Sequence, residues 1–324
     1  MKPTHRAGWW AYLLAILGAG ILALGVAYFV FPASLMKVMV AAERRSAGLQ
    51  RHAVDVEGDH IVYLDGGSGT PVVLLHGFGA NKDIWNKVAA RLIPHYRVIA
   101  PDLPGFGESP ARAGARYDAW SQAQRLHAFL AALDVHAYHV GGNSMGALVA
   151  VVHTSLYPQD VRSLMIGAAP GVRAPQESET YKLVAAGTNP FVIRGNADFD
   201  RLVNLAFYRP PSIPAPFKRV MLKDWMARSD SYARIFADLK LLLPGPGPLE
   251  PLLPGLAVPT LILWGAHDRM LDVSAAGTFS ATIKGSETTI FPDCGHTLPR
   301  DCPEPVATRY LAFLDAVPTA GPPR

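Results

Sequence analysis

A run of 23 residues without a charged side chain, from Trp9 to Phe31, restricts what this chain can fold into more than any other feature. A helix rises about 1.5 Å per residue, so a helix of this length measures roughly 35 Å and crosses a hydrocarbon core of about 30 Å. Aromatic residues at both ends of the run suit the two membrane interfaces, and Pro32 ends the helix. We therefore predict a transmembrane anchor helix over residues 9–31 and a single-pass membrane protein.

Two other interpretations of this run fit less well. A cleaved signal peptide has an apolar stretch of about 7 to 15 residues followed by small residues at the cleavage site. The run is longer than that, and residues 31–34 make a poor cleavage site. A buried core helix of this length ordinarily has a polar face, which the run lacks. We therefore favour an anchor that stays on the protein.

Basic residues on both sides of the run leave its orientation open. Lys2 and Arg6 precede it and a larger number follow it, so the positive-inside rule alone would keep the rest of the chain in the cytoplasm. A long folded domain can override that count, and the membrane side is therefore not predicted. Residues 32–52 mix apolar with basic side chains, among them Arg44. This juxtamembrane segment suits either a helix on the membrane surface, with basic groups near anionic lipid heads, or a solvated linker helix.

The composition narrows the class of protein. Half of the 324 residues are hydrophobic and 17% are charged, so the chain has enough apolar residues for a sizeable core and is not a disordered chain. The net charge of +4 comes without a long basic run, and nucleic acid is not an expected partner. Cys294 and Cys302 show no metal-binding spacing, and we expect neither a metal nor a cofactor. Whether the two cysteines pair stays open, as does the redox compartment.

After residue 52, short β-branched runs alternate with amphipathic helical stretches, which is typical of a doubly wound α/β sheet. Several of the runs are continuously apolar, as in parallel strands buried on both faces. The predicted strands are Val54–Val56, Ile61–Leu64, Val72–Leu75, Val98–Ala100, Tyr138–Val140, Leu164–Ile166, Thr260–Leu263 and Thr288–Phe291. The predicted helices between them are Asp83–Leu92, Ala119–Leu133, Met145–Tyr157, Val273–Thr282 and Glu304–Ala316.

Residues 173–255 interrupt this alternation. They contain no strand pattern but two helical stretches, Asp198–Tyr208 and Phe217–Leu243, and a proline- and glycine-rich hinge at Pro244–Pro248. We predict a helical cap over the sheet. Its aromatic side chains suit a lid over an apolar pocket. Some of them should attach the cap to the core and others should bind substrate, and the sequence does not separate the two groups. The candidates for substrate binding are Phe199, Phe207 and Trp225.

The strongest chemical signal is Gly142-Asn143-Ser144-Met145-Gly146, which follows a predicted strand and opens a predicted helix. A serine at such a sharp turn needs small neighbours because its backbone is strained. The turn lifts the hydroxyl out of the sheet, above a helix N-terminus whose partial positive charge favours an oxyanion. Ser144 is therefore the predicted nucleophile.

A serine hydroxyl needs a base and an orienting acid, and two downstream loops supply them. Asp268 comes just after the strand Thr260–Leu263, and His296 comes just after the last strand. Functional residues of open α/β sheets gather at these carboxyl ends. We predict that Asp268 orients His296 as the general base, in preference to Asp293, which is too near His296 in sequence to approach its ring from behind.

The remaining part of the predicted site is an oxyanion hole. His76-Gly77-Phe78-Gly79 follows the strand Val72–Leu75, where a glycine-rich turn aims backbone N–H groups at the site. The main-chain N–H groups of Phe78 and Met145 are the two predicted donors.

The segments HGFGANKDIW, DLPGFGES, GNSMG, LWGAHD and DCGH, in this order and spacing, resemble the α/β-hydrolase fold superfamily over residues 53–316. With the N-terminal run, the chain is similar to membrane-anchored monoacylglycerol lipases and esterases. The resemblance implies a mostly parallel eight-stranded sheet flanked by helices, with no cofactor. The predicted boundaries are an N-terminal tail at 1–8, the anchor at 9–31, the juxtamembrane segment at 32–52, the core at 53–172 and 256–316, the cap at 173–255 and a C-terminal tail at 317–324.

The expected reaction is hydrolysis of a carboxylic ester through an acyl-enzyme, with a lipid or another small ester as substrate. Other activities share the machinery. The GNSMG segment also resembles that of serine-dependent carbon–carbon hydrolases of ring-cleavage products, and cofactor-free perhydrolases or haloperoxidases use the same three residues. Acyl length, head group and oligomeric state are not predicted.

Overall fold

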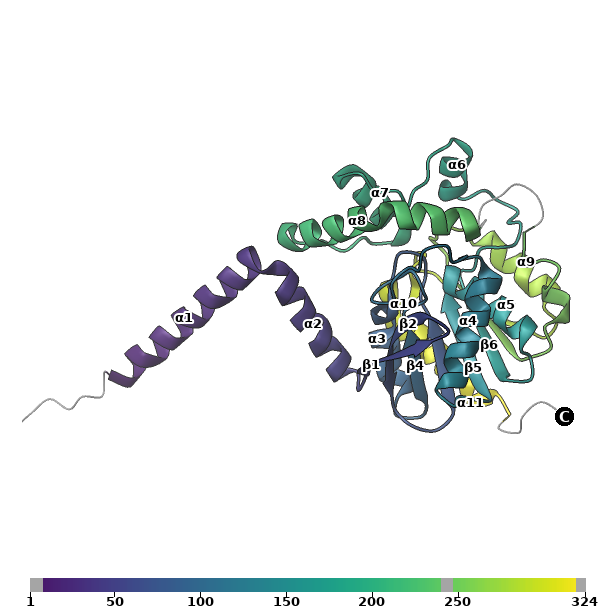
Figure 1. The fold of residues 1–324 in the computed structure, drawn as a ribbon, viewed down its shortest axis with the longest axis horizontal. Helices are drawn as coiled ribbons and strands as arrows, with labels where there is room; N and C mark the ends of the chain where they lie inside the picture. Colours follow the sequence, from purple (N-terminus) through teal and green to yellow (C-terminus); the bar gives the residue numbers. More distant parts are fainter. Residues whose placement is uncertain (1–7, 240–246, 319–324) are drawn as a thin grey trace, which may run out of the picture.

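The computed structural model describes residues 8–239 and 247–318 (Figure 1). Most of the predicted tails at 1–8 and 317–324, and most of the predicted hinge at 244–248, lie outside the described residues.

One eight-stranded sheet forms the centre of the protein, with the strand order β1-β2-β4-β3-β5-β6-β7-β8. The first two pairings, β1 with β2 and β2 with β4, are antiparallel, and all the others are parallel. The α/β expectation is therefore confirmed. The strands are β1 (Gln50–Val56), β2 (Asp59–Gly66), β3 (Pro71–Leu75), β4 (Arg97–Pro101), β5 (Tyr138–Asn143), β6 (Val161–Gly167), β7 (Thr260–Gly265) and β8 (Glu287–Phe291).

Helices cover both faces of the sheet, which explains why the central strands are continuously apolar. Two buried clusters result, one on each face. One face carries α4 (Ala119–Ala132), α5 (Met145–Leu156) and α9 (Ser274–Thr282). The other carries η1 (Lys82–Trp85), α3 (Asn86–Leu92), α10 (Leu298–Asp301) and α11 (Pro303–Ala316).

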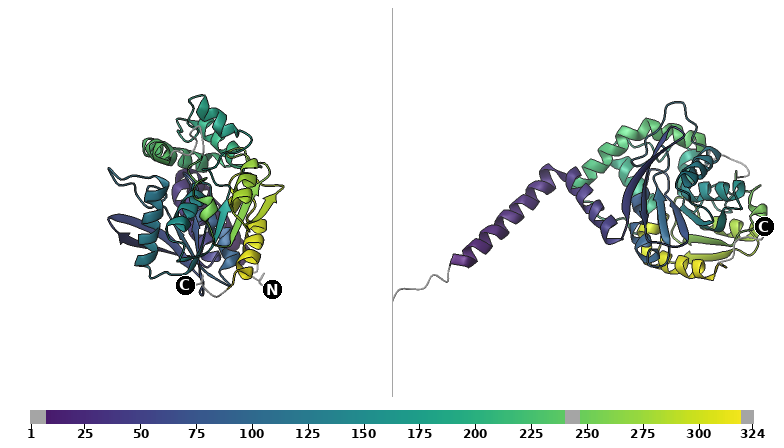
Figure 2. Two further views of the ribbon diagram at one scale, coloured as in Figure 1. Left: turned by 90° about the vertical axis from the view of Figure 1, so that its right-hand side faces the viewer. Right: turned by 60° about the horizontal axis from the view of Figure 1, so that its bottom comes forward.

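A helical cap lies over one edge of the sheet, between β6 and β7 in sequence (Figures 1 and 2). Loops that follow β3 and β8 contact it, so the cap covers the carboxyl ends of the parallel strands. In open α/β sheets this is the edge at which ligands bind. The cap helices are α6 (Glu179–Ala185), α7 (Asn196–Ala206) and α8 (Ala215–Leu239), and the short η2 (Leu253–Gly255) follows them.

The N-terminal helix α1 (Gly8–Val30) projects away from the rest of the protein (Figure 1). Its part from Trp9 to Val30 is long and apolar enough to span a membrane, and none of that span is buried inside the protein. The chain turns at Phe31 and continues as α2 (Pro32–Ser46). At this corner α1 meets the cap, because the rings of Tyr28 and Phe217 pack edge to face, with their centroids 5.5 Å apart.

The last turn of α2 is bound to the core by charged side chains. Arg44 donates two hydrogen bonds to Asp83, of 2.6 and 2.7 Å, and Glu43 accepts one of 3.1 Å from Arg300. Arg44 is thus paired with an acidic side chain of the core, while the position of the rest of α2 relative to a membrane stays a prediction. The sequence pattern indicated that this segment is amphipathic and basic. It could not indicate that Asp83 would lie next to Arg44 in the folded chain.

Candidate active site

Ser144 sits in a strained turn between β5 and α5, with φ 57° and ψ −124°. This conformation is uncommon for a residue with a Cβ and costs about 1 to 3 kcal/mol. The turn is tight on both sides. A Cβ on Gly142 would lie 2.2 Å from the carbonyl carbon of Gly146, and a Cβ on Gly146 would lie 2.2 Å from the carbonyl oxygen of Leu75. Both glycines of the motif are thus required by backbone approach.

His296 and Asp268 form a buried pair at the ends of β8 and β7. The His296 Nδ1 lies 2.8 Å from Asp268 Oδ2. The other carboxylate oxygen accepts the N–H groups of Met270 and Leu271, both at 2.9 Å. Because both oxygens of Asp268 are occupied, the carboxylate has one orientation. Donation of the Nδ1 proton to it leaves Nε2 of His296 as the acceptor.

Asn143, next to Ser144, connects the loop that carries His296 to β5 and β6. Its side-chain amide donates to the carbonyl oxygens of His296, at 3.1 Å, and Gly167, at 3.2 Å. No hydrogen bond joins the Ser144 hydroxyl to His296 within residues 8–239 and 247–318. Such bonds are often long in free enzymes and shorten with substrate. Sequence reasoning named Asn143 only as part of the motif and missed this contact.

The glycine-rich loop after β3 lies directly against the serine. A Cβ added to Gly77 would lie 3.2 Å from Ser144 Cβ and 3.9 Å from its Oγ. The N–H groups of Phe78 and Met145 donate no hydrogen bond within the described ranges 8–239 and 247–318. Met145 is the first residue of α5, and the N–H groups of the first turn of a helix have no carbonyl partner within the helix. Met145 follows Ser144 directly and Phe78 follows Gly77, and the role of their N–H groups as an oxyanion hole stays a prediction.

His76 has a structural position in the same loop. One ring nitrogen, Nδ1, lies 2.8 Å from the carbonyl oxygen of Gly77, and the other, Nε2, accepts the N–H of Leu103 at 3.0 Å. Burial lowers the pKa of His76, so the ring is neutral at pH 7. It therefore connects the glycine-rich loop to the turn that follows β4.

A buried ion pair fixes that turn. Lys82 and Asp102 are both fully buried, with Nζ 2.6 Å from Oδ2. Lys82 Nζ also lies 2.7 Å from Glu108, to which Arg51 donates at 2.8 Å. Burial alone would raise the pKa of Glu108, but the hydrogen bonds from Arg51 and Lys82 lower it to about 2. Asp102 therefore stabilises the shape of the loop, and within residues 8–239 and 247–318 its carboxylate makes no hydrogen bond or ion pair with Ser144.

The three aromatic cap residues predicted to bind substrate occupy different places. Phe199 is buried in the core, with 3% of its surface exposed. Trp225 packs on Gly79, where a Cβ would lie 2.2 Å from its ring, and its Nε1 donates to the Phe191 carbonyl at 3.0 Å. Phe207 is half-buried in the segment that leaves α7. Phe199 and Trp225 thus attach the cap to the core, and Phe207 lies beside the His296 loop.

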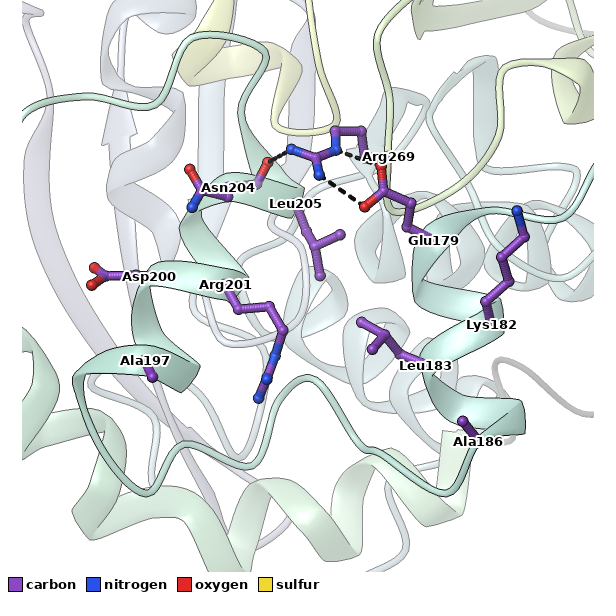
Figure 3. A pocket seen from close by; sticks show the side chains of 10 residues that line it. All are labelled: Glu179, Lys182, Leu183, Ala186, Ala197, Asp200, Arg201, Asn204, Leu205 and Arg269. Atoms are coloured by element: carbon purple, nitrogen blue, oxygen red, sulfur yellow. Dashed lines mark hydrogen bonds and ion pairs between the residues drawn. The ribbon is translucent and has the colours of Figure 1, made fainter.

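A cavity of about 620 Å³ lies between α6 and α7 of the cap (Figure 3). Arg269, the residue after Asp268, reaches its wall and forms a two-pronged ion pair with Glu179, at 2.6 and 2.8 Å. Arg269 also donates to the Asn204 carbonyl at 3.2 Å. Neither Ser144 nor His296 lines this cavity. The acid loop is therefore attached to two cap helices at once.

Other side chains near the pair do not join it. Asp293 is largely exposed, and its nearest cation is Arg209 at 3.4 Å. The ring of His267 stacks on Tyr208, 3.8 Å away. Cys294 forms a disulfide with Cys302. Among residues 8–239 and 247–318 no group of three or more His, Cys, Asp or Glu side chains is arranged to hold a metal ion.

Residues 70–299 match the family model of the alpha/beta hydrolase fold. This chain belongs to the α/β-hydrolase fold family. It is similar to Lipase 1 of Psychrobacter immobilis, with 29% identity over 85% of this chain and 87% of the lipase. It is also similar to monoacylglycerol lipase abhd6-A of Xenopus laevis, with 26% identity over 92% of this chain and 91% of that protein.

Among solved structures, the chain is similar to a membrane phospholipase A described as a bacterial virulence factor. The TM-score is 0.86, with 40% identity over 96% of this chain and 99% of the phospholipase. The lipase relatives and the shared fold show that the α/β hydrolase described here is a carboxylic ester hydrolase.

Proposed function

We propose that this chain is a membrane-anchored serine hydrolase that cleaves acyl esters of glycerolipids through an acyl-enzyme. The observation that carries the proposal is the buried pair of His296 and Asp268, at 2.8 Å, beside the strained turn that carries Ser144. A serine in such a turn, a histidine with one nitrogen occupied by a carboxylate, and two free backbone donors are the parts that acyl transfer needs.

In the proposed mechanism, Ser144 Oγ attacks the ester carbonyl carbon while Nε2 of His296 accepts the serine proton. The N–H groups of Phe78 and Met145 donate to the oxyanion that forms on the carbonyl oxygen. The bond to the alcohol breaks, and the leaving oxygen takes the proton from His296. Water then attacks the acyl-serine with His296 again as the base, which releases the acid and restores the serine. Asp268 holds the imidazole in the required tautomer throughout.

The proposed substrate class follows from the anchor and the cap. Helix α1 would hold the enzyme at a membrane, where acyl esters reach it by lateral diffusion, and the cap contributes apolar side chains such as half-buried Phe207. Monoacylglycerol lipases and a membrane phospholipase A are among the similar proteins. Both names describe enzymes that act on acyl esters of glycerol, which is the substrate class proposed here.

The catalytic domain is proposed to face an oxidising compartment, because Cys294 and Cys302 are joined. Disulfides persist outside the cytosol and are rare within it. The count of basic residues around α1 favours the opposite side, but long domains translocate largely regardless of flanking charge. A Ser212→Cys variant, with the new thiol on the exposed cap, checks the orientation. We expect a membrane-impermeant maleimide to label it in intact cells; labelling only after permeabilisation would place the domain in the cytosol.

The catalytic assignment is tested with a fluorophosphonate probe and p-nitrophenyl esters of C4 to C12 acids. We expect the wild type to be labelled and active, and Ser144→Ala to lose labelling and at least about 10³-fold of its turnover. Ser212→Ala, which removes an exposed cap hydroxyl, is the matched control and should behave as the wild type. A folded wild-type protein that the probe does not label would contradict the proposal.

The substrate class is tested with a panel of monoacylglycerols and phospholipids of graded acyl length. The proposal expects turnover of at least one of these glycerolipids in detergent micelles. Carbon–carbon hydrolases and perhydrolases would also be labelled by the probe, because they use the same residues. An enzyme that is labelled yet cleaves none of these lipids would leave the serine assignment intact and refute the lipid substrate.

A further inference from the structure

The segment that leaves cap helix α7 is hydrogen-bonded directly to the loop that carries His296. The Thr297 N–H donates to the carbonyl oxygen of Ala206 at 3.0 Å. The Tyr208 N–H donates to Oδ2 of Asp301 at 3.0 Å, and the same oxygen accepts the N–H of Gly295. One carboxylate thus binds the residue before His296 and the backbone of the cap together.

The two backbones are also in direct steric contact. A Cβ added to Gly295 would lie 2.5 Å from the Tyr208 nitrogen and 2.9 Å from the Phe207 carbonyl carbon. Gly295 does not have a positive φ, so close approach to the cap is the reason for a residue without a side chain here. The cap therefore touches the chain immediately before and immediately after His296.

Local bonds make the base loop a stiff unit. The N–H of Asp301 donates to Thr297 O at 2.9 Å, and that of Leu298 donates to His296 O at 3.0 Å. The disulfide between Cys294 and Cys302 encloses the whole segment. A displacement of Asp301 or of the cap backbone is consequently transmitted to His296, since the loop has little freedom to absorb it.

We propose that Asp301 is a positioning residue for the general base and that it couples the position of the cap to His296. The inference rests on the proposed role of His296 and deepens it. Asp301 acts through the loop, because its carboxylate accepts two backbone N–H groups and makes no hydrogen bond to Ser144 or His296 among residues 8–239 and 247–318. We call the two hydrogen bonds that Asp301 accepts from Tyr208 and Gly295 the joint. While the joint is intact, the imidazole of His296 is held where it can accept the proton of Ser144. When the joint loosens, the imidazole moves away from Ser144.

The hydrogen bonds accepted by Asp301 determine which variants test the proposal. Two N–H donors converge on one oxygen, and Asp301→Ala leaves both without a partner. Asp301→Asn keeps one carbonyl oxygen that can accept both, so it should restore most of the function if hydrogen bonding is what matters. Gly295→Ala disturbs the joint without touching Asp301, because the new methyl group meets the Tyr208 backbone. Asp293→Ala, an exposed carboxylate in the same loop, is the matched control.

The measurement is the second-order rate constant of fluorophosphonate labelling, together with the final labelled fraction, on full-length protein in detergent micelles. The final fraction counts folded sites, and the rate constant reports how well His296 activates Ser144. We expect Asp301→Ala and Gly295→Ala to lower the rate constant about 10- to 100-fold, with Asp301→Asn within about threefold of the wild type and Asp293→Ala unchanged. With p-nitrophenyl butyrate, kcat should fall in the same proportion while KM stays near its wild-type value.

The opposite result has a distinct signature. If Asp301 serves folding alone, the final labelled fraction falls while the rate constant of the folded molecules equals that of the wild type, and the proposal is overturned. Should Asp301→Ala not fold, Gly295→Ala and Asp301→Asn still decide, because an unchanged rate constant in Gly295→Ala or a 10-fold loss in Asp301→Asn contradicts it. Absence of labelling in the wild type refutes the proposed function itself and is thereby distinguishable.

Discussion

The cap is attached to the loop after β3 and to the loops after β7 and β8 by different kinds of contact. On the β3 side, the ring centroid of Phe78 lies 4.6 Å from that of Phe191, 5.5 Å from that of Tyr232 and 5.8 Å from that of Phe236. On the other side the attachments are polar. They comprise the ion pair of Arg269 with Glu179 and the hydrogen bonds of Thr297 and Asp301 to the end of α7.

The difference matters because the two kinds of contact respond differently to motion. Apolar contacts depend on buried area and have little directional preference, so aromatic rings can slide over one another at small cost. Hydrogen bonds weaken steeply when their angle or length changes. We therefore expect the aromatic side to supply most of the adhesion of the cap, and the polar side to fix its register relative to the loops after β7 and β8.

The largest expected effect on stability comes from the aromatic side. Trp225→Ala removes the ring that packs on Gly79 and Tyr232, together with the hydrogen bond to Phe191. Truncation of a buried Trp costs about 3 to 5 kcal/mol, and we expect about 2 to 4 kcal/mol for this half-buried one. Urea denaturation in detergent micelles measures the loss. Met226→Ala, an exposed neighbour on α8, should cost under about 0.5 kcal/mol. Equal losses of unfolding free energy in the two variants would contradict the expectation that the aromatic contacts hold the cap on the core.

A smaller effect is expected from the disulfide that encloses the base loop. Cys294 and Cys302 are 8 residues apart, and loop closure of that length predicts about 2.5 kcal/mol of stabilisation. The variant Cys294→Ala with Cys302→Ala should lose that amount in the same denaturation assay. A reducing agent should destabilise the wild type and leave the double variant unaffected. If the reagent lowers the free energy of unfolding of both proteins equally, the disulfide does not stabilise the loop that carries His296.

The smallest effect belongs to the exposed ion pair. The hydrogen bond from Arg269 lowers the pKa of Glu179 against the opposing effect of burial. A carboxylate with a lowered folded-state pKa stabilises above its unfolded pKa, near 4.3, and loses that contribution as the pH falls below it. Both side chains are about half exposed, so Glu179→Gln should cost only about 0.2 to 1 kcal/mol at pH 7. Unfolding curves of variant and wild type should converge as the pH falls from the unfolded pKa through the lowered folded-state pKa of Glu179. A constant difference would assign the effect to something other than charge.

The sheet could be predicted from the sequence because its signals are local. Each central strand is an apolar run such as Val72–Leu75, and each lies within a strand of the structure. The turn at Ser144 was likewise predictable, since its two glycines lie only two residues before and after the serine. Helix α6, in contrast, has only seven residues and a short apolar pattern, and α10 is one turn long, so neither produced a periodic signal.

Contacts between distant residues were not predictable in the same way. Nothing in the sequence links Arg44 to Asp83, Asn143 to the carbonyl of His296, or Asp301 to Tyr208. Each of these bonds joins a side chain to a partner that only the folding of the sheet brings near.

The amino-acid sequence by itself determined the apolar N-terminal helix, the alternation of strands and helices, and the residue types able to carry ester hydrolysis. These depend on short-range periodicity and on turns whose requirements lie within a few residues. The tertiary structure alone decided that Cys294 meets Cys302, that α2 is bound to the core, and that the cap contacts the chain on both sides of His296. The physical reason is that hydrogen bonds and steric exclusion act over a few ångströms, a distance that the order of residues does not specify until the chain has folded.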